Sequence, residues 1–236
     1  MTYFSRFPKL LTKSNGNPII IRDFFHRVHV SKNFRDESIV LDNYFVLDGE
    51  TPEIVSNKIY GTPFNHWIIL LVNSIVNPRE EWPVSQKQLV DRIYLKYPFK
   101  IQVPDSSFYT IDDEIISDND GSFVVTDIDS DNDIISLLSL TGKIILTTSN
   151  TLSNISVDPV LTGLPITSLD TPLEVIHHYV DVNTGYIMDY DIGNPDIVPV
   201  TNWEYEETTN DEKRVIKVLN PQYISFFITD FSNKIG

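Results

Sequence analysis

The sequence predicts an α+β protein, and three observations support this class. Hydrophobic residues follow strand and then helix spacing in residues 40–98, whereas short β-branched runs broken by Asp, Asn, Gly and Ser fill residues 99–182. An apolar pattern with helical spacing follows near the end of the chain. At 236 residues and 41% hydrophobic composition, the chain can build a sizeable core. We expect four parts, with boundaries at 1–39, 40–98, 99–182 and 183–236.

Residues 1–39 are predicted to form an N-terminal arm and a short helix. The run Asn15-Gly16-Asn17-Pro18 lies between two apolar stretches and has the composition of a turn, so the arm should be extended with a turn in it. Residues 22–29 have the pattern of one or two helical turns. An extended arm must dock on a surface to be ordered, either on the chain's own fold or on a partner.

The next part begins with a predicted strand and turn. Alternation from Tyr44 to Leu47 indicates a half-buried strand, and Asp48-Gly49 is typical of a turn with positive φ. Thr51 is the expected N-cap of a first helix that ends at Gly61. These elements form the start of a compact module.

Two further helices are expected after that glycine. The first begins at Pro63 and is apolar nearly all round, which predicts burial between other elements. The second has a capping box at Ser85 and Gln88 and an amphipathic pattern that stops at Pro98. In the last part, we expect an irregular connection with one or two strands, and then a helix that Asn220 caps.

The order of strand, turn, helix, Tyr-Gly and second helix resembles the LysM module. A more detailed pattern is similar to the LysM-like baseplate wedge proteins of contractile-tailed, T-even-like bacteriophages. It consists of Ile59, Tyr60, Gly61, Pro63, Trp67, Asn77, Pro78 and Trp82. Residues 202–231 resemble the C-terminal segment of the same family. The resemblance implies a LysM-like βαα(β) module with flanking helices and arms, and an acidic antiparallel β-rich insertion.

The same resemblance implies a structural function. A wedge subunit of this kind clamps neighbouring wedges around the central hub of the tail baseplate by protein–protein contacts, without catalysis and without a cofactor. Its partners would be other wedge subunits, adjacent wedges, and hub or tube proteins. It would be made in the host cytoplasm and reside in the virion.

Aromatic residues are the expected anchors of such contacts, because interfaces are enriched in them. The candidates are Phe4, Phe7, Phe24 and Phe25 at the front, Tyr223, Phe226, Phe227 and Phe231 at the back, and Asp48, Gly49, Glu50 and Thr51 at the turn. The expected module core comprises Tyr44, Ile59, Tyr60, Gly61, Trp67 and Trp82.

An alternative function is peptidoglycan binding, since many LysM modules bind glycan. The resemblance then implies a groove between Asp48–Thr51 and Asn73–Val76. Trp67, Trp82, Tyr60 and Tyr94 could stack on sugar rings there, although their helical positions favour the core. The absence of an export signal and the single copy of the module favour the structural function.

Charge and composition exclude several classes of function. The net charge is −15, and it belongs to the second part: residues 1–100 hold 13 Lys and Arg against 10 Asp and Glu, and residues 101–236 hold 5 against 23. This acidity would repel a phosphate backbone, so no nucleic-acid partner is expected. No apolar run is long enough to predict a membrane span. Without Cys there is no disulfide, thiolate metal site or thiol nucleophile.

Two acidic clusters are candidate metal or catalytic sites. Asp127, Asp129, Asp131 and Asp133 resemble half of a calcium loop, but an EF-hand requires Gly and Glu where Asn132 and Leu138 stand. An acidic hairpin turn is therefore the preferred interpretation, with a weak cation site as the alternative. A lytic enzyme would need paired carboxylates, and the adjacent residues Asp112, Asp113 and Glu114 do not indicate such a pair.

The histidines do not predict a metal centre. His177 and His178 are consecutive on a strand-like run, so we expect them on opposite faces, one in the core and one on the surface. His26 and His29 could share a helix face, but no third ligand accompanies them. A metal site is therefore not expected.

Overall fold

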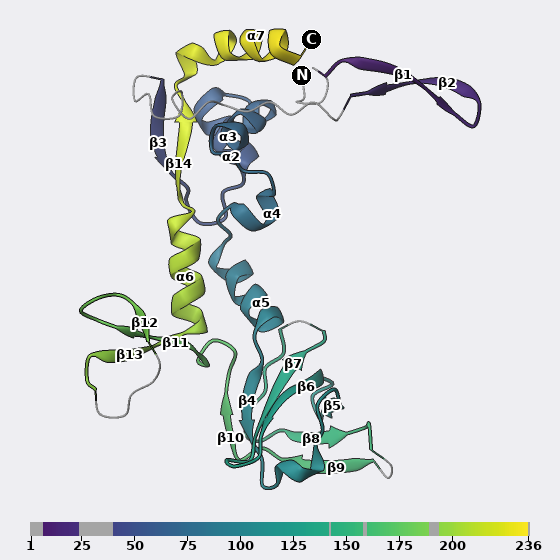
Figure 1. Cartoon of the computed structure of the whole chain (residues 1–236), viewed down its shortest axis with the longest axis vertical. Coiled ribbons are helices and arrows are strands. Elements are labelled where there is room, and N and C mark those ends of the chain that lie inside the picture. The colour runs from purple at the N-terminus through teal and green to yellow at the C-terminus, as the bar shows by residue number, and fades with distance from the viewer. Residues whose placement is uncertain (1–6, 24–39, 142, 158–159, 189–193, 236) are drawn as a thin grey trace. The chain divides into compact units, whose positions relative to one another are not determined.

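The computed structural model describes residues 7–23, 40–141, 143–157, 160–188 and 194–235 (Figure 1). It has mixed helix and sheet, in two compact units. The first unit contains residues 1–85 and 210–236, and the second contains residues 86–209. This division differs from the predicted four parts, because the C-terminal segment joins the first unit and the helix after Ser85 joins the second.

The first unit begins with a hairpin. Strands β1 (Lys9–Ser14) and β2 (Asn17–Arg22) pair antiparallel, and Asn15 and Gly16 between them both have positive φ, at 50° and 83°. Positive φ at both central residues defines the type I′ turn, which suits the twist of a tight hairpin. The arm is thus extended with a turn, as predicted. The predicted helical turns over 22–29 lie almost entirely outside the described residues.

The module of the first unit has the order strand, helix, helix, strand (Figure 1). It comprises β3 (Leu41–Phe45), α2 (Pro52–Tyr60), the short 3-10 helix η2 (Pro63–Asn65), α3 (His66–Val72) and β14 (Val215–Leu219). Thr51 caps α2 by accepting a hydrogen bond from the Ile54 amide, and Gly61 ends it at a φ of 68°. These are the predicted helix signals. The second strand, which pairs antiparallel with β3, comes from far along the chain.

The C-terminal segment covers α3. Asn220 caps the 3-10 helix η4 (Pro221–Tyr223), which continues as α7 (Ile224–Ile235). The ring of Phe231 on α7 lies 4.7 Å from the ring of Trp67 on α3. A second core cluster lies around Val46, Trp82 and Ile216, where the short helix α4 (Pro78–Glu81) precedes Trp82.

The second unit contains α5 (Gln86–Lys96) and a seven-stranded antiparallel sheet in the order β10-β4-β7-β6-β5-β8-β9. The strands are β4 (Phe99–Gln102), β5 (Glu114–Ser117), β6 (Ser122–Asp129), β7 (Ile134–Ser139), β8 (Thr151–Asn154), β9 (Leu161–Pro165) and β10 (Ser168–Asp170). Phe99 and Phe123 are the largest of the fully buried side chains in its core. The acidic run of residues 130–133 forms the β6–β7 turn, as predicted.

The sequence predicts short strands throughout residues 99–182, but the β-branched runs at 108–111 and 143–148 are not strands. Phe108 ends a 3-10 helix, η3 (Ser106–Phe108), which Asp105 caps by accepting from the Ser107 amide. β-branched composition measures how well a residue suits a pleated surface, but it does not supply a pairing partner.

The irregular connection that was predicted after residue 183 is more ordered than expected. A small sheet, in the order β12-β11-β13, contains β11 (Ile176–Asp181), β12 (Ile187–Met188) and β13 (Ile197–Thr201). It leads into helix α6 (Asn202–Glu212). This helix lacks an apolar stripe, but Thr201 and Glu204 form a capping box with reciprocal hydrogen bonds of 2.8 and 3.2 Å. Along the described chain, no helix is both long and apolar enough to span a membrane.

Candidate functional site

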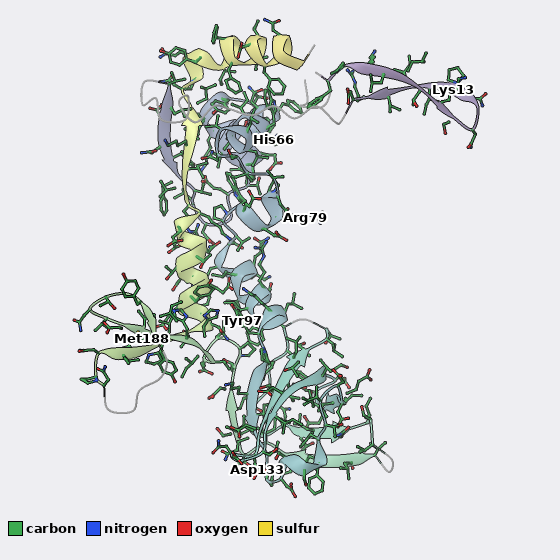
Figure 2. The ribbon with its side chains drawn as sticks, in the orientation of Figure 1. Lys13, His66, Arg79, Tyr97, Asp133 and Met188 are labelled. Atoms are coloured by element: carbon green, nitrogen blue, oxygen red, sulfur yellow. The ribbon has the colours of Figure 1, made fainter. Side chains whose placement is uncertain are left out.

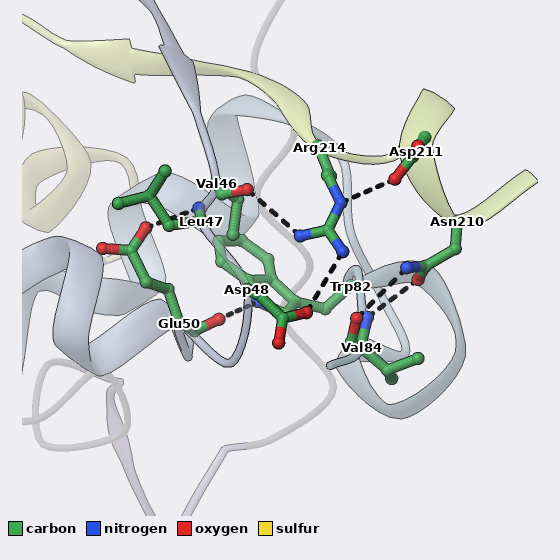
Figure 3. Close-up of polar contacts among 9 residues, drawn as sticks. All are labelled: Val46, Leu47, Asp48, Glu50, Trp82, Val84, Asn210, Asp211 and Arg214. Atoms are coloured by element: carbon green, nitrogen blue, oxygen red, sulfur yellow. Dashed lines mark hydrogen bonds and ion pairs between the residues drawn. The ribbon is translucent and has the colours of Figure 1, made fainter. Parts of the chain in front are cut away.

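The turn that follows β3 is held by a buried carboxylate, that of Glu50. It accepts hydrogen bonds from the Leu47 amide at 2.8 Å and the Tyr44 hydroxyl at 3.0 Å, and it pairs with the ammonium of Lys58. Burial raises the pKa of Glu50, but these hydrogen bonds outweigh it, and the net pKa is lowered. The backbone carbonyl of Glu50 accepts from the Trp82 indole at 2.7 Å (Figure 3). Glu50 therefore fixes the turn from within.

Arg214, just before β14, closes the other side of this turn (Figure 3). Its guanidinium donates to the Val46 carbonyl and to the Asp48 carboxylate, both at 3.3 Å, and to Asp211 at 2.7 Å. The side chain of Arg214 is largely buried, whereas the two carboxylates are exposed. Asp48 is thus part of an ion pair within the chain.

Two asparagines tie the C-terminal segment to the module. The Asn73 amide donates to the Lys217 carbonyl at 2.7 Å and accepts from its N–H at 2.8 Å. The Asn210 amide makes the same two bonds to Val84, at 3.1 and 2.8 Å (Figure 3). The Tyr60 hydroxyl accepts from the β14 backbone at Leu219, and burial raises the pKa of Tyr60 to about 12. Most polar groups expected around a glycan groove are therefore engaged inside the module.

The predicted aromatic anchors lie in different environments. Phe7 and Phe231 are buried against each other in the chain's own core, with ring centroids 6.5 Å apart, so they are not available at its surface. Tyr223 and Phe227 are partly buried against the same cluster, whereas Phe226 is 73% exposed. Phe4, Phe24 and Phe25 lie outside the described residues.

The candidate sugar-stacking aromatics are mostly buried. Trp67, Trp82 and Tyr94 are all less than 10% exposed, and Tyr60 is partly buried beside the same clusters. Gly49 has a φ of 75°, which the turn requires, and Thr51 serves as a helix cap. These residues have structural roles that account for their presence.

The prediction for His177 and His178 is wrong. A register shift between Ile176 and His178 interrupts the alternation of β11, and the two Nδ1 atoms lie 2.8 Å apart. Neither ring is in the core, and His177 stacks on Tyr205 at 4.0 Å between centroids. Burial, His178 and Lys96 lower the pKa of His177. Within the described residues, no group of three His, Asp or Glu could hold a metal ion.

The acidic candidates have structural roles. Asp113 is buried and accepts hydrogen bonds from the Thr110 amide and hydroxyl and from the Asn154 amide, at 2.8, 2.8 and 2.6 Å. Burial raises the pKa of Asp113, but these bonds lower it by more, so the net pKa is below the ordinary value. Asp133 accepts from the backbone and hydroxyl of Ser106. These contacts hold loops of the sheet in place.

Exposed apolar residues form the surfaces that the sequence did not single out. Leu11 and Ile20 on the hairpin are 76% and 68% exposed, and Tyr186 and Ile187 near β12 are 72% and 71% exposed. The sequence signal for these surfaces was the apolar composition of short strands. Such strands have too few neighbouring strands to bury both of their faces. Such exposed apolar groups are typical of interaction surfaces.

Comparison with known families decides the class of the protein. Residues 8–122 match the family model described as base plate wedge protein 53. This stretch is that of a phage baseplate wedge protein. The match places the chain in the virion, at the tail baseplate, as a structural protein. No curated protein matches the chain.

The match covers one part of the chain and leaves out another. It covers the hairpin, β3, the module helices and the start of the seven-stranded sheet, and it ends at the first residue of β6. It does not include residues 202–231, for which the sequence suggested the same resemblance. The matched part of the module thus lacks β14 and α7, which complete its core.

Proposed function

We propose that this wedge protein is a non-enzymatic clamp, which joins neighbouring wedges around the central hub by protein–protein contacts. The observation that carries the proposal is the family match over residues 8–122. Its partners would be other wedge subunits, adjacent wedges, and hub or tube proteins. The internal hydrogen bonds of Glu50, Asp113 and Asp133 agree with a function without catalysis.

The contact residues that we propose are those that the fold leaves at the surface. Phe226 is the most exposed of the described aromatic candidates, although it is part of an otherwise well-packed helix. An exposed aromatic ring beside a rigid core is typical of an interface anchor, because little conformational entropy is lost when it is covered. Phe226 is therefore the first position to test.

The order strand, helix, helix, strand in the first unit supports the LysM-like interpretation of the module. Glycan binding would nevertheless need free polar groups and exposed aromatic faces. The carboxylate of Glu50 and the amide of Asn73 are bonded internally, and Trp67 and Trp82 are buried. These contacts favour a protein-binding module over a peptidoglycan-binding one.

The proposal can be tested by affinity purification of the tagged chain from phage-infected cells, followed by cross-linking and mass spectrometry. We expect baseplate subunits in fixed ratios, and cross-links that involve α7. Phe226→Ala should reduce their recovery, whereas Ile54→Ala, at another exposed apolar position, should not. Co-sedimentation with insoluble peptidoglycan, or recovery without any baseplate subunit, would contradict the clamp function.

A further inference from the structure

The β1–β2 hairpin has an apolar face that is surrounded by cations. The register pairs Lys9 with Arg22, Leu11 with Ile20, and Lys13 with Pro18, and paired residues share one face of a two-stranded sheet. Leu11 and Ile20 are therefore on the same side as all three cations, and we call this side the cationic face. Figure 2 labels Lys13 near the tip of the hairpin. A two-stranded hairpin is marginally stable alone, so a partner that covers this face would stabilise it.

The small sheet of the second unit has an apolar face with the opposite charge. The register aligns Ile187, Val180 and Val198 in one row across the three strands. Asp196 lies in the turn just before β13, where its carbonyl accepts from the Val182 amide at 2.9 Å and continues the register of Val180 and Val198. We call this side the acidic face. Its Ile187 is 71% exposed, and no residue of the three strands belongs to a buried core cluster among the residues described.

A groove continues the acidic face toward α6. It is about 440 Å³ in volume, and it is lined by His178, Val198, Pro199, Val200, Glu204, Tyr205 and Thr208. Valine and tyrosine side chains provide apolar walls, and Glu204, whose carboxylate accepts from the amide and hydroxyl of Thr201, is among the lining residues. Such a space accommodates aliphatic side chains of the size of Leu11 or Ile20.

Charge along the sequence makes these two faces complementary. The hairpin holds three cations and no acid, whereas residues 144–212 contain no Lys or Arg at all. Lys9 and Lys13 are four residues apart on one strand, or about 13 Å. Asp196 is separated by the same four residues from Val200, which lines the groove beside Glu204. The two faces therefore carry opposite charges.

We infer that the cationic face of one copy of this chain docks on the acidic face of a second copy. Leu11 and Ile20 cover Val198 and Ile187 and enter the groove beside Tyr205. Lys9 and Lys13 lie against Asp196 and Glu204. Burial of the aliphatic pairs supplies the affinity, and the charges fix the orientation and the partner. This contact does not depend on the clamp function.

Such a contact is heterologous, because it joins two different surfaces of the same chain. A pair of copies keeps one acidic face and one cationic face free for further copies, so association continues into rings or open chains rather than stopping at a dimer. Rim charges contribute to the contact, so it weakens as salt rises. Both properties can be measured on the full chain.

Sedimentation velocity of the full chain from about 1 to about 100 µM tests the inference over the range of a moderate interface. We expect concentration-dependent association that weakens at least tenfold in Leu11→Glu and in Ile187→Glu. Both positions are more than two-thirds exposed, so the fold should persist. Val76→Glu is the matched control, since Val76 is an 88% exposed aliphatic residue outside both faces.

A mixture of the two variants gives the decisive result. Leu11→Glu keeps the acidic face, and Ile187→Glu keeps the cationic face, so an equimolar mixture should form a one-to-one complex that grows no further. A wild-type chain that stays monomeric throughout, or one whose association neither variant weakens, would overturn the inference. An equal loss in Val76→Glu, or a mixture that remains monomeric, would overturn it as well.

Discussion

The two units of this chain build their cores from the sequence in different ways. The first unit is assembled from two distant segments, and its second strand and covering helix come after the entire second unit. The core of the second unit is built instead by neighbouring hairpins such as β5–β6–β7, with β4 alongside. Charge differs too: the first unit holds 13 Lys and Arg against 12 Asp and Glu, and the second holds 5 against 21.

Because of this difference, different changes should destabilise the two units. In the first unit, a few side chains bridge segments that are more than a hundred residues apart, as Asn73 does to Lys217 and Asn210 to Val84. In the second unit, backbone ladders between strands close in sequence hold the sheet, and side-chain ties are secondary. Loss of one distant segment should therefore affect the first unit alone.

Removal of residues 215–236 should have the largest effect. It deletes β14 and α7, and it exposes the core around Trp67 and Ile68 to water. We expect residues 40–85 to lose their fold while the seven-stranded sheet persists. Limited proteolysis with mass spectrometry would show cleavage confined to residues 40–85. Continued protection of this segment would mean that β14 is dispensable.

Substitutions in the two cores should have the next largest effect, and each should destabilise one unit only. Trp67→Ala and Phe123→Ala each delete a buried aromatic side chain, which costs about 3–5 kcal/mol. We expect each variant to lower the denaturant midpoint of its own unit only, as followed by hydrogen exchange of each unit. An equal shift in both units would show that they unfold as one.

Acid should weaken the first unit through Glu50. The folded pKa of Glu50 lies below its ordinary value of 4.5, so the carboxylate contributes stability above pH 4.5, and this is lost as the pH falls through the folded pKa. Glu50→Gln should cost about 1.5–3 kcal/mol at neutral pH, since it weakens hydrogen bonds to a charged group. It should also make the free energy of unfolding of the first unit depend less on pH in acid, which we call a flatter acid limb of the stability curve.

The comparable carboxylate in the second unit is Asp113, whose folded pKa is also lowered. Asp113→Asn should flatten the acid limb of the second unit and leave that of the first unchanged. Urea titrations between about pH 2 and pH 7 would show both effects, because carboxylates titrate in this range. An unchanged acid limb in either variant would contradict the assignment for that unit.

Loss of the Asn210 tie should have a moderate effect. Asn210→Ala leaves the N–H and the carbonyl of Val84 without this partner, and it should destabilise the first unit by about 1–3 kcal/mol. Asn183→Ala, at an exposed position, is the control and should change stability little. Similar midpoints for both variants in chemical denaturation would show that the tie is unimportant.

Substitutions of two tyrosines should have the smallest effects on stability, and these effects should differ in sign. Within the described residues, the Tyr109 hydroxyl in the second unit is buried without a hydrogen-bond partner, and burial raises the pKa of Tyr109 to about 12. Tyr109→Phe should therefore be neutral or stabilising by up to about 1 kcal/mol. Tyr60→Phe removes the acceptor for the Leu219 amide and should destabilise by about 1 kcal/mol. In thermal unfolding, the midpoint temperature should stay unchanged or rise for Tyr109→Phe and should fall for Tyr60→Phe.

The sequence by itself determined the local features of this protein. Thr51 and Gly61 marked the ends of α2, Asn15-Gly16 marked the hairpin turn, and Asn220-Pro221 marked the start of the C-terminal helix. These signals act within a few residues, through cap hydrogen bonds and φ preferences, so they can be read without knowledge of the fold. The α+β class and the baseplate assignment followed from the same local patterns.

Only the tertiary structure decided which distant segments meet. Nothing local in residues 215–219 indicates that they pair with β3, and the alternation of His177 and His178 gave no sign of the register shift that joins their rings. The sequence also left undecided whether Phe7 lies in a core or at an interface, because an aromatic residue suits both. Pairing, burial and register depend on the free energy of the whole fold, and a short sequence pattern carries only part of it.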